Sequence, residues 1–483
     1  MPFAFLNALQ NLLPPEALVL DHERLRAFEC DALSGYRALP LAVALPASEA
    51  EVVAVVKLCR THRIPLVPRG AGTGLSGGAL PVEGALLLGL SRMRSLLALD
   101  PVSRTARVQP GVRNLAVSEA AAPYGLYYAP DPSSQIACSI GGNVAENAGG
   151  VHCLKYGLTV HNVLGLRLVT TEGDVLTLGG ACLDSPGYDL LALTIGSEGL
   201  LGIVTEVTLR LLPRPQTAQV ILAGFPTVSA AAEAVAALMA EGITPAGLEL
   251  MDQPTVRAVE DYLHAGYPTE AAALLLAEAD GSAAEVEADI AQMRELLLRC
   301  GANSLRVSRD ETERQAFWAG RKAAFPAASR LAPDYYCMDG TIPRRKLAEV
   351  LEGIAELSRE FGRPCINVFH AGDGNLHPLI LYDANVPGQF ARTEAMGLAI
   401  ARLCVAAGGA ISGEHGVGVE KLDAMCSQFG PDELAQFLAV KRAFDPQGLL
   451  NPGKAIPTLH RCAELGGVHI HGGQTRFPDL PRF

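Results

Sequence analysis

Three glycine-rich blocks in the first half of the chain place the tightest constraint on its fold. They span residues 68–78, 131–150 and 196–204, and the middle block is almost free of bulky side chains. Glycine has no side chain to pack in a core, but it lets a ligand approach the backbone closely. These blocks therefore predict loops that lie against a flat or phosphorylated ligand, with tight turns that bind nothing as the alternative for the first block.

The first block follows the second of two predicted strands. Strands are expected at residues 41–45 and 64–67, joined by a helix that begins after Ser48, where Ser48 and Glu51 form a capping box, and ends near His62. After the glycines, residues 85–90 form another apolar run typical of a strand. The loop therefore connects two strands.

Within this loop, Gly72, Gly74 and Gly77 match the dinucleotide fingerprint G-x-G-x-x-G, and Asp100 lies at about the distance expected of a ribose ligand. In a Rossmann fold, however, that loop follows the first strand and opens a helix. We therefore reject a Rossmann fold and expect backbone amides of the loop to bind a pyrophosphate without a helix.

A cluster of metal-ligand residue types stands in the second half. His370 and His377 flank the turn 372–375, and Glu414 and His415 follow some forty residues later. Apolar runs on both sides predict a hairpin with His370 directly opposite His377. Two imidazoles and the Glu414 carboxylate suit a divalent ion such as zinc, with His415 as a general base. The alternative, histidines satisfied within a core or turn, is disfavoured by the glycines around every candidate.

Composition excludes several classes of function. With 483 residues, 49% hydrophobic and 19% charged, the chain is long enough for two or three globular domains. Its net charge of -12 argues against a nucleic-acid partner. The 11 cysteines have no iron–sulfur spacing, the amino terminus lacks the basic region of a signal peptide, and no apolar run approaches the ~20 residues that span a bilayer. We expect a cytoplasmic protein with at most peripheral membrane contact.

The domain boundaries are predicted from turn signals and periodicity. Strands of the first domain end near residue 211, before the Pro213 to Pro215 turn. Helices at 228–240 and 283–299, with a strand at 272–277 between them, indicate a second α+β domain. The predicted division is a helical segment at 1–37, a first domain at 38–217, a second at 218–456 and an irregular tail at 457–483.

Together the three blocks resemble the flavin-binding domain of the vanillyl-alcohol-oxidase or PCMH-type superfamily, and residues 218–456 resemble its FAD-linked oxidase C-terminal domain. Segments 334–343, 370–378 and 444–454 are similar to those of the FAD-linked subunits of bacterial glycolate oxidases, whose relatives include D-lactate and D-2-hydroxyglutarate dehydrogenases. The resemblance implies an α+β fold with a two-subdomain PCMH-type FAD-binding domain followed by an α+β FAD-linked oxidase C-terminal domain.

The same resemblance implies that FAD lies across the first domain. The first block would hold the pyrophosphate, the second the ring system, and the third the adenine and ribose. Because the first loop has no histidine and His152 stands beyond the second block, we expect non-covalent FAD. The implied FAD-binding residues are Pro68, Arg69, Gly70, Ala71, Gly72, Thr73, Gly74, Asp131, Pro132, Ser133, Gly141, Gly142, Asn143, Ala145, Asn147, Gly149, Gly150, Glu198, Gly199, Gly202, Ile203 and Asn451.

For the second domain the resemblance implies zinc or manganese on His370, His377 and Glu414, with His415 as the base. Asn375 and Arg321 would bind the substrate carboxylate. The hydroxyglutarate enzymes have a lysine where this chain has residues 336–338. The missing charge favours a small monocarboxylate.

The implied reaction is oxidation of glycolate to glyoxylate, and also of D-lactate, by hydride transfer to the flavin. Since the chain has no iron–sulfur spacing, electrons would pass to an iron–sulfur subunit and a second flavin-type subunit. D-lactate or another D-2-hydroxyacid is the alternative substrate. Two other classes stay open from sequence: a metal-dependent hydrolase, which would leave the first domain idle, and a non-catalytic scaffold subunit, which the intact cluster disfavours.

Overall fold

The computed structural model describes residues 2–181 and 186–457. The chain begins with a small sheet in the order β1-β2-β4-β3, in which β2, β4 and β3 are parallel. Its strands are β1 (Leu18–Val19), β2 (Ala42–Ala44), β3 (Leu66–Arg69) and β4 (Leu86–Gly89), and the helices packed with it are α1 (Pro2–Leu12) and α3 (Glu49–His62). As predicted, Ser48 caps α3 by accepting a hydrogen bond from the Glu51 amide.

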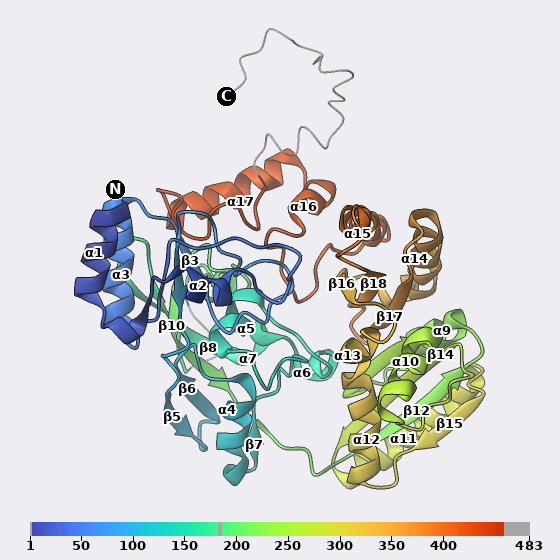
Figure 1. The fold of residues 1–483 in the computed structure, drawn as a ribbon. Coiled ribbons are helices and arrows are strands. Elements are labelled where there is room, and N and C mark those ends of the chain that lie inside the picture. Colours follow the sequence, from blue (N-terminus) through green and yellow to red (C-terminus); the bar gives the residue numbers. More distant parts are fainter. Residues whose placement is uncertain (1, 182–185, 458–483) are drawn as a thin grey trace.

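A five-stranded antiparallel sheet completes the first domain (Figure 1). Its order is β5 (Leu96–Asp100), β6 (Thr105–Val108), β10 (Ile203–Arg210), β8 (Val163–Val169) and β9 (Val175–Gly179). The helices of this region are α4 (Asn114–Ala121), α5 (Ile140–Glu146), α6 (Cys153–Tyr156), α7 (Thr159–Asn162) and α8 (Leu190–Thr194), and β7 (Leu126–Tyr127) pairs with β11 (Leu212–Pro213). The two sheets form the two predicted subdomains.

The second domain is built on one antiparallel sheet. Its order is β15 (Ser304–Val307), β12 (Thr217–Phe225), β14 (Ala273–Gly281), β13 (Gly247–Asp252), β17 (Cys365–His370), β18 (Pro378–Tyr382) and β16 (Asp334–Cys337). One face packs on α9 (Val228–Ala240), α11 (Ala283–Arg299), α14 (Leu347–Phe361) and α15 (Gln389–Ala406). The other packs on α10 (Gln253–Leu263), α12 (Glu311–Lys322) and α13 (Ala324–Ala328). The predicted helices at 228–240 and 283–299 are confirmed.

Strand alternation decides which residues of this sheet face the first domain. Met251, Leu276 and Val368 pack on the face covered by α10, α12 and α13, whose core also includes Val151 of the first domain. Since side chains two positions apart share a face, Glu249, Glu278 and His370 point the same way. The sheet thus presents polar groups at the domain boundary.

The end of the described chain returns to the first domain. After α16 (Leu422–Gln428) and α17 (Pro431–Phe444), Leu450 forms a parallel bridge with Leu66 of β3. In Figure 1, α17 lies above the first domain and next to α16, and its Leu434 packs in the core of the second domain. The predicted tail at 457–483 lies outside the described residues apart from Pro457.

The predicted helical segment at 1–37 is only partly right. Besides α1 and α2 (His22–Leu25), it contains β1, which pairs antiparallel with β2. Two apolar residues, Leu18 and Val19, are too short a run to be distinguished from a helix by periodicity. The 3₁₀ turns are η1 (Pro15–Ala17), η2 (Arg26–Phe28), η3 (Ala122–Tyr124) and η4 (Arg344–Lys346). Among the described residues, the helices lack the combination of length and apolar character that crossing a bilayer needs.

His152 links the two domains through charge. Its Nδ1 lies 2.7 Å from Asp131 Oδ2 in the first domain, and its Nε2 lies 3.1 Å from Glu278 Oε1 on β14. Arg314 donates to the other Glu278 oxygen at 2.8 Å. Burial alone would lower the pKa of His152, but the two carboxylates raise it well above its usual 6.5. The imidazolium therefore holds the domains together.

Replacing His152 by alanine should lower the free energy of unfolding by about 2–3 kcal/mol, because two charge-assisted hydrogen bonds are lost. A folded-state pKa above the unfolded value means that this stability is complete below about pH 6.5 and is lost as pH rises through the raised pKa. Urea unfolding at pH 6 and pH 9 measures the difference. The exposed His22→Ala variant is the control, and a deficit that grows with pH would contradict this prediction.

Candidate active site at the domain boundary

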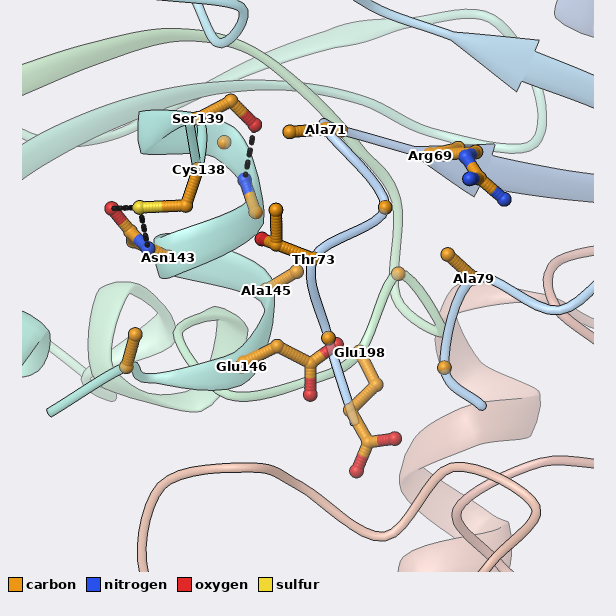
Figure 2. Close-up of a pocket in the computed structure, with 18 of the residues that line it drawn as sticks. Arg69, Ala71, Thr73, Ala79, Cys138, Ser139, Asn143, Ala145, Glu146 and Glu198 are labelled. Carbon is orange, nitrogen blue, oxygen red and sulfur yellow. Dashed lines mark hydrogen bonds between the residues drawn. The ribbon is translucent and has the colours of Figure 1, made fainter. Parts of the chain in front are cut away.

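One cavity joins the three glycine blocks to the histidine cluster. It is lined by residues of all three blocks together with Phe325, His377, Glu414 and His415 of the second domain. Figure 2 shows the first-domain side of this cavity, where the first glycine loop passes beside α5 and Glu198. The glycine blocks and the histidines therefore border one space. A metal-dependent hydrolase would use the histidines alone and leave the first domain without a role, which this shared cavity disfavours.

Most of the residues predicted to bind FAD line this cavity. Close packing explains two of the glycines: a Cβ at Gly141 would lie 3.1 Å from the Pro110 carbonyl oxygen, and one at Gly149 would overlap the Glu414 carboxylate. The predicted residues found in the wall are Pro68, Arg69, Gly70, Ala71, Gly72, Thr73, Gly74, Pro132, Ser133, Gly141, Gly142, Asn143, Ala145, Gly149, Glu198, Gly199, Gly202 and Ile203.

Four predicted FAD-binding residues do not line the cavity, because each has another partner. Asp131 binds His152, and Gly150 packs against the Asp131 backbone. Asn147 ends α5 in the left-handed conformation, and its Oδ1 accepts from the Val160 amide. Asn451 donates to the carbonyl oxygens of Gly78 and Glu198, which ties the first block to the third. These residues support the cavity from behind.

The connection between the first block and β4 agrees with rejection of a Rossmann fold. The loop runs from β3 to the parallel strand β4, and the described chain between them contains no helix. Asp100 is exposed, and its carboxylate accepts from the amides of Val102 and Ser103 in a turn. It is not among the residues that line the cavity.

The three predicted metal ligands meet at the Glu414 carboxylate, although His370 is not in the group whose ligand atoms all lie within 4.8 Å of one another, which is Asp339, His377, Glu414 and His415. Glu414 Oε1 lies 2.9 Å from His377 Nε2 and 3.5 Å from His370 Nε2. The other ring nitrogens are held from behind: His370 Nδ1 lies 2.6 Å from Glu249 Oε1, and His377 Nδ1 lies 3.2 Å from the Met338 carbonyl oxygen. Those partners accept from Nδ1–H, so both Nε2 atoms face the carboxylate. Although burial alone would lower the pKa of each ring, the neighbouring acidic groups raise the pKa of His370 well above 6.5 and that of His377 to about 10, so without an ion each Nε2 carries a proton toward Glu414. This donor set fits a divalent cation.

The hairpin that carries the two histidines exists, but its predicted register is wrong. Asn367 pairs with Pro378, and His370 is bridged to Asn375 instead of His377. The turn is therefore residues 371–374, which makes the two histidines diagonal neighbours on one face. Diagonal side chains still meet across antiparallel strands, and the two rings lie 5.1 Å apart.

His415 lies beside this cluster with one nitrogen free. Its ring stacks on His377 at 4.9 Å, and its Nε2 lies 3.7 Å from Glu414 Oε1. Its Nδ1 is buried and has no hydrogen-bond partner among the described residues, and the same holds for Oδ1 of Asn375. Burial lowers the pKa of His415 to about 4, so the ring is neutral near pH 7 and can accept a proton.

Glu249 and Arg321 form a buried support for His370. Glu249 stands opposite His370 on the neighbouring strand, and its second oxygen lies 2.7 Å from Arg321 Nε. Arg321 is only 1% exposed and is not among the residues that line the cavity. Its guanidinium therefore pairs with a protein carboxylate, whereas the sequence predicted a substrate carboxylate.

Asp339 is a site residue that the sequence analysis missed. Its side chain accepts from the amides of Glu414 at 3.1 Å and His415 at 2.9 Å, and from Lys421 Nζ at 3.1 Å. One of its oxygens lies within 4.8 Å of ligand atoms of His377, Glu414 and His415, but its oxygens are occupied by these donors. Asp339 therefore fixes the turn that carries Glu414 and His415. Its place in segment 334–343 was the only signal in the sequence.

Two family models together match most of the chain. The model described as "FAD binding domain" matches residues 40–179. The model described as "FAD linked oxidases, C-terminal domain" matches residues 214–455. The first match covers the first two glycine blocks, and the second covers the histidine cluster.

Curated relatives match nearly the full length. "Glycolate oxidase subunit GlcD" of Escherichia coli strain K12 is 59% identical over 478 residues, which cover 99% of this chain and 96% of that protein. "D-lactate dehydrogenase" of Anaerostipes hadrus is 34% identical and covers 92% of this chain and 95% of that protein. A solved structure of p-cresol methylhydroxylase with substrate bound shares the fold, with a TM-score of 0.82 at 18% identity, over 95% of this chain and 98% of that one.

Asp339→Asn should lower the free energy of unfolding by about 2–4 kcal/mol. It removes the nearer of two carboxylates from the buried Lys421, leaving Glu420 at 3.6 Å, and places an amide N–H against backbone N–H donors. Urea unfolding measures this loss. Asp261→Asn, at an exposed position of α10, serves as the matched control and should cost less than about 0.5 kcal/mol. Equal midpoints for the two variants would contradict a supporting role for Asp339.

Proposed function

Because this chain belongs to the FAD-linked oxidase family, we propose that it oxidises glycolate to glyoxylate on FAD. The observation that carries the proposal is the shared cavity, in which the glycine blocks of the flavin-binding domain meet His377, Glu414 and His415. The 59% identical relative is named a glycolate oxidase subunit. D-lactate is the second candidate substrate, because a 34% identical relative is named D-lactate dehydrogenase.

The first domain would hold the cofactor. Residues 68–74 offer backbone amides for the pyrophosphate, residues 132–149 face the ring system, and residues 198–203 face the adenine and ribose. FAD, when bound, supplies the acceptor for the hydride of the substrate. Attachment is non-covalent, since the nearby His152 has both ring nitrogens engaged by Asp131 and Glu278.

The second domain would hold a zinc or manganese ion on His370, His377 and Glu414. The donor set fits, because two imidazole nitrogens and a carboxylate oxygen meet there. The ion supplies a Lewis acid that lowers the pKa of the substrate hydroxyl. Glu249 and the Met338 carbonyl accept from Nδ1–H of the two rings, so Nε2 is the nitrogen aimed at the ion.

His415 would remove the hydroxyl proton. Its Nδ1 is buried without a partner in the described part of the chain, and its low pKa keeps the ring neutral. His415 would take this proton, and bound FAD would accept the Cα hydrogen with its bonding electron pair, which together make a two-electron oxidation. Asn375 Oδ1 is buried without a partner among the described residues, but Asn375 does not line the cavity, and Arg321 would act through Glu249 and His370.

The electrons would leave through partner subunits. Among the described residues, every group that could ligate a metal includes His377 and His415. This part of the chain therefore offers no separate iron–sulfur site. An iron–sulfur subunit and a second flavin-type subunit are the proposed acceptors, since the similar protein from Escherichia coli is itself named as a subunit. The chain itself would be cytoplasmic, and such partners would attach it peripherally to the inner face of the membrane.

Anaerobic addition of glycolate to the purified FAD-loaded protein should bleach the flavin absorbance. His415→Ala should still bind FAD but bleach at least about 10²-fold more slowly, because it lacks the general base. His264→Ala, at an exposed helix end, is the control. A yellow wild-type protein that no short 2-hydroxy acid bleaches would overturn the proposed reaction, and a fast His415→Ala variant would remove His415 from it.

Dialysis against a chelator should remove one divalent ion per chain and abolish bleaching, with recovery when zinc or manganese is restored. Elemental analysis before and after dialysis measures the metal. His377→Ala should bind FAD but no stoichiometric metal, since the carboxylate and one imidazole alone hold the ion weakly. Full activity in a metal-free protein would return the histidines to a structural role.

A further inference from the structure

One carboxyl group in the cavity wall has no part in the mechanism above. Glu146 is the last residue of α5 and lines the same cavity as His377, Glu414 and His415. In Figure 2 its side chain extends from α5 toward the first glycine loop and Glu198. Its Oε2 is buried and has no hydrogen-bond partner among residues 2–181 and 186–457. A buried polar atom of this kind calls for a partner from the ligand.

The carboxyl group lies between two glycines. A Cβ at Gly78 would come within 2.9 Å of Glu146 Oε1, and one at Gly416 would overlap Oε2. Gly78 belongs to the first glycine block, and Gly416 directly follows His415. Glu146 therefore touches the end of the cavity where both domains meet beside the proposed base. Because the hydride would be transferred beside His415, the ring system of FAD would reach this end. Glu198 borders the same Gly416 and would lie there too, with the rest of the third block near the adenine and ribose.

Four charged groups act on Glu146, and only Asp31 has an oxygen, Oδ2, that is buried without a partner among the described residues. Both Glu198 oxygens accept backbone amides, from Val417 at 2.7 Å and Gly418 at 2.6 Å. Lys421 donates to Asp339, and Lys454 donates to the Gly78 carbonyl oxygen. Burial, followed by the negative charge of Glu198, raises the pKa of Glu146 well above its usual 4.5. A neutral carboxyl group carries an O–H donor, which this cavity leaves unused.

We propose that the buried, unpartnered carboxyl group of Glu146 hydrogen-bonds the bound flavin ring and raises its reduction potential. The flavin ring gains negative charge when it is reduced, so a hydrogen bond donated to a ring oxygen or nitrogen becomes stronger. The reduced flavin is therefore stabilised more than the oxidised flavin. Glu146 is thus a tuning residue for the cofactor. The inference rests on the FAD site of the proposed function, but it needs neither the substrate nor the metal.

The test is the midpoint potential of the flavin in the FAD-loaded full chain, measured against a reference dye during anaerobic reduction with a chemical reductant. Glu146→Ala should lower the potential by about 30 mV, a tenfold change in the equilibrium constant of a two-electron couple. Glu146→Gln keeps a neutral N–H donor and should stay close to wild type. Glu83→Ala, at an exposed position of the same domain, is the control.

A wild-type potential in Glu146→Ala would overturn the proposal. A raised potential in Glu146→Gln would also overturn it, because the main effect would then be removal of a negative charge. If the alanine variant does not fold, the potential of Glu146→Gln decides the question alone. The chemical reductant separates the two conclusions: failure of glycolate to bleach the wild type would defeat the proposed substrate, and these potentials would remain interpretable.

Discussion

The site depends on two imidazoles and a carboxylate that meet in a buried place. Nε2 of His370 and Nε2 of His377 both face Glu414 Oε1, at 3.5 and 2.9 Å. Without a metal ion, protons on the two imidazoles balance the carboxylate, which raises the pKa of both rings, and a bound cation would replace those protons. Strand pairing places Glu249 behind His370, and Asp339 fixes the turn of Glu414. The second domain is thus organised around a point that attracts positive charge.

The first domain contacts the site formed by His370, His377 and Glu414. Gly149 leaves room for the Glu414 carboxylate, and Glu198 accepts the amides of Val417 and Gly418 just beyond His415. His152 adds a charged link to Glu278 on the sheet of the second domain. A flavin in the glycine blocks and a substrate on the metal would therefore share one cavity. The proximity required for hydride transfer follows from how the domains pack.

Local signals in the sequence predicted much of this arrangement, and long-range pairing explains the rest. Glycine loops, the Ser48 cap and the amphipathic helices depend on neighbouring residues, so their positions could be read directly. The hairpin of His370 and His377 was predicted with the wrong register, because the sequence does not fix which turn residues pair. Glu249 and Asp339 could not be recognised from spacing, since their partners lie far along the chain and each is a single carboxylate among apolar residues.

The most direct test is anomalous X-ray scattering from crystals of the protein loaded with FAD and zinc. The account predicts one strong anomalous peak bonded to His370 Nε2, His377 Nε2 and the Glu414 carboxylate, at about 2.0–2.2 Å from each ligand atom. It also predicts the flavin ring in the adjoining cavity beside His415. A flavin in place with no anomalous peak between these residues, or a peak bonded elsewhere, would contradict the account.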